Sequence, residues 1–151
     1  MQGLRLGGHP LHPALVHFPV VCWTVIPVLD LGYLLTQAPA WWQASFWCGV
    51  VGAAMGLVAM CAGFMDLMAM AEEHPGQAVA ERHMMLMGSA WCLAVVALIL
   101  QRPDRIPDAM QAWGSFSLSA AGFLSLGLGA YQGARLVYDF GVGHNRDPSP
   151  S

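Results

Sequence analysis

The sequence contains four apolar stretches that are each long enough to cross a lipid bilayer, which takes about 20 predominantly apolar residues in a helix. Only 10% of the residues are charged and 56% are hydrophobic, whereas a soluble domain carries about 25% charged residues. Such a chain cannot cover a surface that faces water, so we expect an integral membrane protein in contact with the lipid bilayer. The predicted helices span residues 13–36, 41–68, 81–101 and 113–140.

Short connections link these predicted helices, over residues 37–40, 69–80 and 102–112. Short links make consecutive helices antiparallel neighbours, so the predicted fold class is all-α, a transmembrane antiparallel (up-down-up-down) four-helix bundle. One domain is expected over residues 1–144, followed by a disordered polar tail at 145–151 that is rich in proline and serine. No internal repeat is evident in the sequence.

Prolines mark the first predicted helix. Pro13 suits the first position of a helix, with His12 as a possible capping residue before it. Pro19 and Pro27 lie inside the helix, where a proline removes a backbone hydrogen bond and predicts a kink.

The alternation of the helices gathers the polar chemistry at one end of the bundle, which we call the histidine side: the end where the first helix begins. The opposite side carries Arg102 and Arg105, and Asp30 lies in the first helix toward it with no role that the sequence assigns. More arginines lie on the histidine side, so the positive-inside rule favours a cytoplasmic location for it. The residues at or near the histidine side include all six histidines and four other candidates: His9, His12, His17, His74, His83, His144, Asp66, Arg82, Arg135 and Tyr138.

Two of these histidines, His17 and His83, are expected at similar depth on the first and third helices. Those helices are diagonal in a four-helix bundle, and two imidazoles that face each other across the core can ligate a haem iron axially. The sequence therefore predicts a b-type haem between His17 and His83. The alternative is that both rings only form hydrogen bonds near the membrane surface.

Charged residues near the same side could complete this site. Arg82, Arg135 and Tyr138 could contact the haem propionates, because guanidinium groups pair well with carboxylates. Asp66 is expected to face inward, since a carboxylate at membrane depth is costly without a partner. It could orient a ligating histidine through that residue's second ring nitrogen, or form a structural ion pair with an arginine.

A metal ion without a porphyrin is a second possibility. His9 and His12 are each followed by proline, and with His17, His83 and Asp66 they could form a copper or zinc site.

Other classes are disfavoured. The chain has no lysine and its arginines do not cluster, so no nucleic-acid partner is expected. No hydrolase or transferase motif is present, and electron transfer is the most that the sequence suggests as an activity.

The segment GHPLHPALVHFP at residues 8–19, together with residues 62–67, 81–83 and 133–143, forms a recognisable pattern. In these segments the chain resembles an uncharacterised family of bacterial four-helix membrane domains. Members of that family occur fused to Rieske iron–sulfur or c-type cytochrome domains, so the resemblance implies electron transfer in a bacterial inner membrane. The positions that match are His9, His12, His17, Asp66, His83 and Tyr138.

Two functions follow from these expectations. The first is a haem-binding protein that exchanges electrons with a separate redox protein or a quinone. The second is an accessory subunit, without a cofactor of its own, of a larger respiratory or photosynthetic membrane complex.

Overall fold

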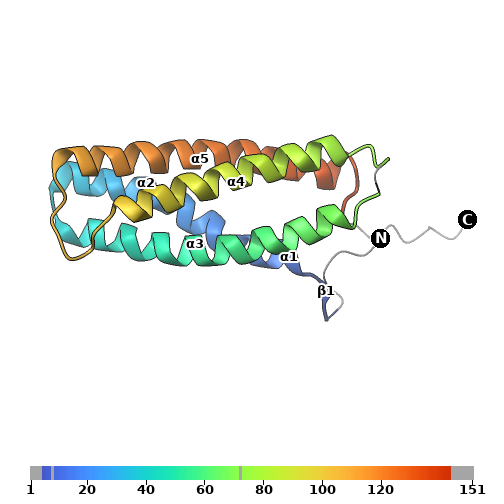
Figure 1. The fold of residues 1–151 in the computed structure, drawn as a ribbon, viewed down its shortest axis with the longest axis horizontal. Coiled ribbons are helices and arrows are strands. Elements are labelled where there is room, and N and C mark those ends of the chain that lie inside the picture. Colours follow the sequence, from blue (N-terminus) through green and yellow to red (C-terminus); the bar gives the residue numbers. More distant parts are fainter. Residues whose placement is uncertain (1–4, 8, 72, 144–151) are drawn as a thin grey trace, which may run out of the picture.

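The computed structural model describes residues 5–7, 9–71 and 73–143. It confirms the predicted antiparallel four-helix bundle (Figure 1). A short hairpin, β1 (Arg5–Leu6) paired with β2 (His9–Pro10), leads into a five-residue helix. The predicted tail lies outside the described residues. The helices are α1 (Leu11–Leu15), α2 (His17–Thr36), α3 (Pro39–Met68), α4 (Gln77–Leu100) and α5 (Ala109–Tyr138).

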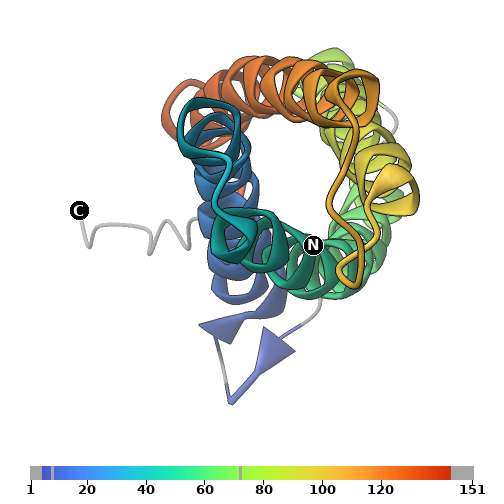
Figure 2. The same ribbon diagram turned by 90° about the vertical axis from the view of Figure 1, so that its left-hand side faces the viewer.

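The four long helices surround a common axis, as the end-on view in Figure 2 shows. Helix α2 packs against α3 and α5, and α4 packs against the same two helices. Helices α2 and α4, which correspond to the first and third predicted helices, are therefore diagonal partners, as predicted.

The first predicted helix is divided at Val16 into α1 and α2. Pro19 explains the break, because it cannot donate a backbone hydrogen bond to the carbonyl of Leu15 and its ring crowds that carbonyl. Pro27 lies inside α2 without ending it. His12 does not precede the helix as a cap, because it lies within α1.

Helices α4 and α5 each begin four residues earlier than the hydropathy predicts. Each of these first turns holds one polar residue, Gln77 in α4 and Gln111 in α5, among apolar ones. At the start of α5, Asp108 accepts a hydrogen bond from the backbone of Gln111, whose side chain bonds back to Asp108. Such a capping box fixes where a helix starts without any apolar residue.

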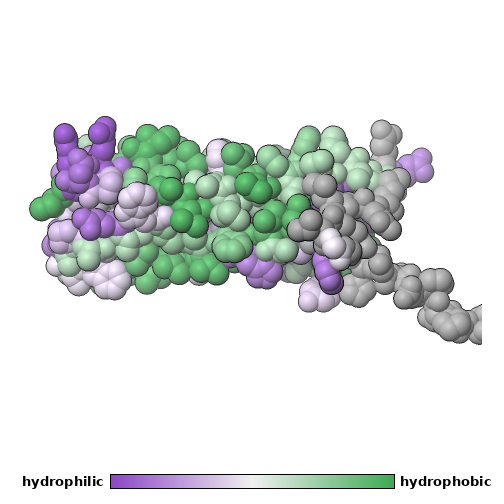
Figure 3. Space-filling view, turned by 90° about the horizontal axis from the view of Figure 1, so that it is seen from below, coloured by the Kyte–Doolittle hydropathy of each residue, from purple (hydrophilic) through white to green (hydrophobic). Residues whose placement is uncertain are grey.

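Much of the outer surface is apolar, as expected for contact with lipid. Figure 3 shows hydrophobic residues over the middle of the bundle and hydrophilic residues gathered at its left end. Three helical stretches are long and apolar enough to span a membrane: Leu11–Thr36, Pro39–Met68 and Gln77–Leu100. Helix α5 is 30 residues long, but its five glycines and four serines lower its mean hydropathy.

The fold contains an internal repeat that was not evident from the sequence. Helices α3 and α5 are both 30 residues long, and α5 begins 70 positions after α3 (109 − 39). Six of the seven buried residues of α3 have a buried counterpart 70 positions later in α5. These pairs are Trp42 and Ala112, Ser45 and Ser115, Gly49 and Ser119, Gly52 and Gly122, Gly56 and Leu126, and Ala59 and Gly129.

The other two long helices follow the same rule with an offset of 71. Buried Pro19, Ile26 and Asp30 correspond to buried Ala90, Ala97 and Gln101. The bundle is therefore two helical hairpins, α1–α3 and α4–α5, related by a pseudo-twofold axis along its length, like the parallel repeats of some transporters.

Candidate functional site

His12 projects from α1 onto α3, near the histidine side of the bundle. Its Nδ1 lies 2.8 Å from the carbonyl oxygen of Ala59. The ring packs against Gly63, one turn further along α3: a Cβ added to that glycine would lie 2.8 Å from the ring's Cε1. A residue larger than glycine would displace the imidazole, so Gly63 provides the space that His12 occupies.

His83 makes the same contacts in the second hairpin. Its Nδ1 lies 2.8 Å from the carbonyl oxygen of Gly129 on α5, and a Cβ added to Gly133 would lie 3.0 Å from its Cε1. His83 comes 71 positions after His12 (83 − 12), and its two contact residues come 70 positions after Ala59 and Gly63. The two histidines are thus equivalent positions of the internal repeat.

These hydrogen bonds place a hydrogen on Nδ1 of both rings. A backbone carbonyl can only accept a hydrogen bond, so Nδ1 of each ring must carry the proton and donate it. In a neutral imidazole the other nitrogen, Nε2, then holds a lone pair. Histidines that bind metals are held in this way, with the second ring nitrogen donating to a carbonyl or a carboxylate.

The two rings face each other across the pseudo-twofold axis. Their centroids are 6.4 Å apart and their planes are inclined by 85°. Both side chains are half-buried. The structure thus brings together one imidazole from each hairpin, each bonded through Nδ1 to a backbone carbonyl.

Apolar clusters lie on both sides of the histidine pair along the bundle. Toward the end of the molecule, Val79, Ala80 and Leu136 pack together with Phe140. Toward the middle, Trp23 and Leu126 pack with Met87 and Trp91. The contacts of His12 on α3 lie roughly 11 Å from the centre of that helix at 1.5 Å per residue. A bilayer centred on α3, with a hydrocarbon region about 30 Å thick, would enclose them.

One protein family matches almost the whole chain. Residues 8–146 match the family described as "Predicted membrane protein (DUF2231)". The chain belongs to this family. No curated protein and no solved structure matches the chain significantly. The match agrees with the expected membrane domain, and it carries no information on the fusions that the resemblance implied.

In this family member, the predicted ligand His17 does not lie opposite His83. Its side chain is exposed, and its Nδ1 lies 3.3 Å from the carbonyl oxygen of Ala14 in the preceding turn. The break at Val16 separates the two histidines, so that His12 on α1 faces the bundle. His9 lies in β2 and is exposed.

The residues expected to contact propionates lie at the histidine side but outside the histidine pair. Arg82 is exposed and Tyr138 is 85% exposed. Arg135 forms an ion pair with Asp139, at 3.1 Å between Nε and Oδ2. Asp66 is half-buried on α3, three residues after Gly63.

The structure does not assemble the copper or zinc site considered above. Among the described residues, no group of three or more histidine, cysteine, aspartate and glutamate side chains is placed to hold a metal ion. His9, His12, His17, His83 and Asp66 thus do not form a common coordination sphere.

Sequence reasoning missed the partner of His83 and the glycines beneath both rings. An offset of 70 or 71 positions is the signal that would have found them, because 71 positions relate His12 to His83 and 70 positions relate Gly63 to Gly133. The same offset relates Ser45 to Ser115, which belong to a second polar cluster described below.

Proposed function

We propose that this membrane protein binds a b-type haem between His12 and His83 and exchanges electrons near the histidine side of the membrane. The observation that carries the proposal is the pair of imidazoles, each held by a carbonyl at Nδ1 and 6.4 Å apart between centroids. In this proposal His12 replaces His17 as the partner of His83.

The donor chemistry and the spacing fit axial ligation. Each ring offers a neutral Nε2 with a fixed orientation, which is the usual ligand of haem iron. Metal–imidazole bonds of about 2.0–2.1 Å place the centroids of two opposite ligands roughly 6 Å apart. Haem would supply an iron atom that alternates between ferrous and ferric states.

Other groups at the histidine side extend the proposal. Arg82, Arg135 and Tyr138 are retained as contacts of the haem propionates, since all three lie beyond the histidine pair toward the end of the bundle. The electron partner would be a redox protein or a quinone, and the membrane would be a bacterial inner membrane with the histidine side in the cytoplasm.

An absorption spectrum of the full chain, purified without a histidine tag from cells supplied with haem, tests the proposal. We expect a Soret band and about one iron per chain. His12→Ala and His83→Ala should each weaken that band, and the matched control His17→Ala should leave it unchanged. A colourless protein obtained with haem in excess rejects the proposal, as does a Soret band that His17→Ala removes and His12→Ala does not.

A cofactor-free accessory subunit is a second candidate, and one observation favours it. The two Nδ1 bonds join α1 to α3 and α4 to α5, so each histidine also fastens two helices of its own hairpin. A colourless, metal-free protein that co-purifies in detergent with a respiratory or photosynthetic complex would support this function. Copper or zinc found in stoichiometric amounts instead of iron would assign the pair to a metal ion.

A further inference from the structure

A second polar cluster surrounds Asp30 near the opposite side of the bundle. The carboxylate is 1% exposed. Its Oδ1 accepts hydrogen bonds from Ser45 Oγ at 2.5 Å and Gln101 Nε2 at 3.3 Å. Its Oδ2 accepts from Ser119 Oγ at 2.8 Å and Ser115 Oγ at 3.1 Å. All four long helices contribute, because Gln101 is the C-cap of α4.

Within the part of the chain that the structure describes, the groups bonded to this carboxylate include no cation. The groups that face Asp30 from α3, α4 and α5 are uncharged hydroxyls and an amide. Cys22 and Cys48 pack further along, against the cluster around Trp23. The charged residues of the nearby α4–α5 connection are all exposed: Arg102, Asp104, Arg105 and Asp108. An acidic group at membrane depth without a cation is a functional candidate by default.

The hydrogen-bonding partners can accommodate both states of the acid. Gln101 Nε2 also lies 3.0 Å from Ser45 Oγ and 2.8 Å from Ser115 Oγ. A hydroxyl group both donates and accepts, so each serine can donate to an ionised carboxylate or accept from a protonated one. The change requires hydroxyl hydrogens to rotate and no heavy atom to move.

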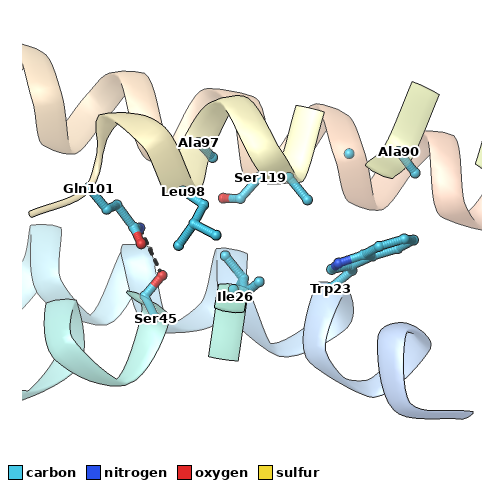
Figure 4. A pocket seen from close by; sticks show the side chains of 11 residues that line it. Trp23, Ile26, Ser45, Ala90, Ala97, Leu98, Gln101 and Ser119 are labelled. Carbon is cyan, nitrogen blue, oxygen red and sulfur yellow. Dashed lines mark hydrogen bonds between the residues drawn. The ribbon is translucent and has the colours of Figure 1, made fainter. Parts of the chain in front are cut away.

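A small cavity borders this cluster and extends toward the middle of the bundle (Figure 4). Its volume of about 10 Å³ matches the smallest space that holds one water molecule. Ser45, Gln101 and Ser119 line it on one side and Trp23 on the other. The indole Nε1 of Trp23 is buried and has no hydrogen-bond partner, and Figure 4 shows the nitrogen edge of the ring turned toward Ile26, on the side where Ser119 lies.

We propose that Asp30 is a reversible proton-binding site inside the membrane, served by a water molecule in this cavity. The water accepts a hydrogen bond from Trp23 Nε1 and bonds to the serine hydroxyls beside it. Uptake forms one O–H bond on an Asp30 oxygen, and release breaks it. The proton comes from hydronium in the aqueous phase, whose O–H bond breaks to leave water, and release returns the proton to water. This site is independent of the histidine pair and does not require haem.

Infrared difference spectroscopy over a pH titration of the full chain in lipid nanodiscs tests the proposal. The carbonyl stretch of one protonated carboxyl group should appear as the pH falls and vanish in Asp30→Asn. Asp104→Asn, which changes an exposed carboxylate of the α4–α5 connection, should retain the band. Asp30→Glu keeps a carboxyl group and should shift the band, which assigns it even if Asp30→Asn fails to fold.

Two results would overturn the assignment: the lack of any band that depends on Asp30, and a band that persists unchanged at every pH.

The water is tested separately with Trp23→Phe, which removes the unpartnered N–H group. We expect the shift of the carbonyl band in D₂O to develop several-fold more slowly in this variant. Trp91→Phe is the matched control, since its Nε1 already donates to the carbonyl of Ala53 at 2.9 Å. Equal rates in both variants would exclude the water from the site.

Discussion

The bundle holds two polar centres on one pseudo-twofold axis, and they differ in whether equivalent positions of the repeat carry the same residue. At the histidine side, equivalent positions carry the same residue, His12 and His83. At the opposite side, equivalent positions carry different residues, Asp30 and Gln101. The contacts of the two centres on α3, Ala59 and Ser45, are roughly 21 Å apart along the helix.

This difference shows how a repeat generates two kinds of site from one scaffold. Identical residues across the axis place two imidazole rings 6.4 Å apart between centroids, and a pair of imidazoles suits one shared metal atom. Unequal residues place one acid, Asp30, opposite one amide, Gln101. The acid can hold a charge, and the amide donates N–H groups to the hydroxyls around it. The second arrangement suits a proton, whose binding changes the charge of only one residue.

The largest effect on stability is expected at the asymmetric centre. Asp30→Ala removes the acceptor of three serine hydroxyls and leaves buried donors without partners, so we expect a loss of about 3 kcal/mol in the free energy of unfolding. Asp30→Asn retains one acceptor oxygen and should cost less. Denaturant unfolding in detergent micelles measures the loss for each variant. A loss below about 1 kcal/mol for Asp30→Ala would show that the serines find other partners and that the cluster is not a tight network.

A smaller effect is expected at the symmetric centre. Gly63→Ala places a Cβ 2.8 Å from the ring of His12, and Gly133→Ala places one 3.0 Å from the ring of His83. Overpacking of this kind costs about 1–3 kcal/mol, and it should also weaken haem binding, more in Gly63→Ala than in Gly133→Ala. The absorption spectrum and unfolding in micelles measure the two effects.

Gly127→Ala is the matched control for these glycine variants. It lies on the same helix as Gly133, but a Cβ there meets nothing within 4 Å. If all three variants behave alike, the glycines beneath the rings are not what positions the histidines.

The comparison also explains what could be predicted from the sequence. Hydropathy and connection lengths were sufficient for the bundle and for the diagonal placement of α2 and α4, because lipid-facing helices must be long and apolar. The start of α5 was missed because the capping box of Asp108 and Gln111 leaves no trace in hydropathy. The start of α4 was missed as well, and that helix begins after Gly76 without a side-chain cap. The division at Val16 was missed because Pro19 could kink the helix or break it, and a break turns His12 rather than His17 toward the bundle.

The site was less predictable than the fold, for a physical reason. The contacts of His12 and His83 are made to backbone carbonyls, which every residue has, so no side-chain motif reveals them. The cluster around Asp30 combines five side chains from four helices, and the offset of 70 or 71 positions links four of them: Asp30 with Gln101, and Ser45 with Ser115. That offset is visible once helix bounds are known, since it aligns buried positions rather than similar residue types.

The smallest effect on stability is expected at the exposed ion pair of Asp139 and Arg135, which contrasts with the buried carboxylate of Asp30. Asp139 is exposed at the histidine side and already paired with Arg135, four residues before it. Such surface pairs contribute about 0.3–0.5 kcal/mol, so Arg135→Ala should change the free energy of unfolding of the haem-free protein by no more than that. A loss above about 1 kcal/mol would show that Arg135 supports the apolar cluster around Leu136 instead. In the haem-loaded protein, the same variant should weaken retention of haem if Arg135 contacts a propionate, whereas Asp139→Ala, which frees the guanidinium, should not.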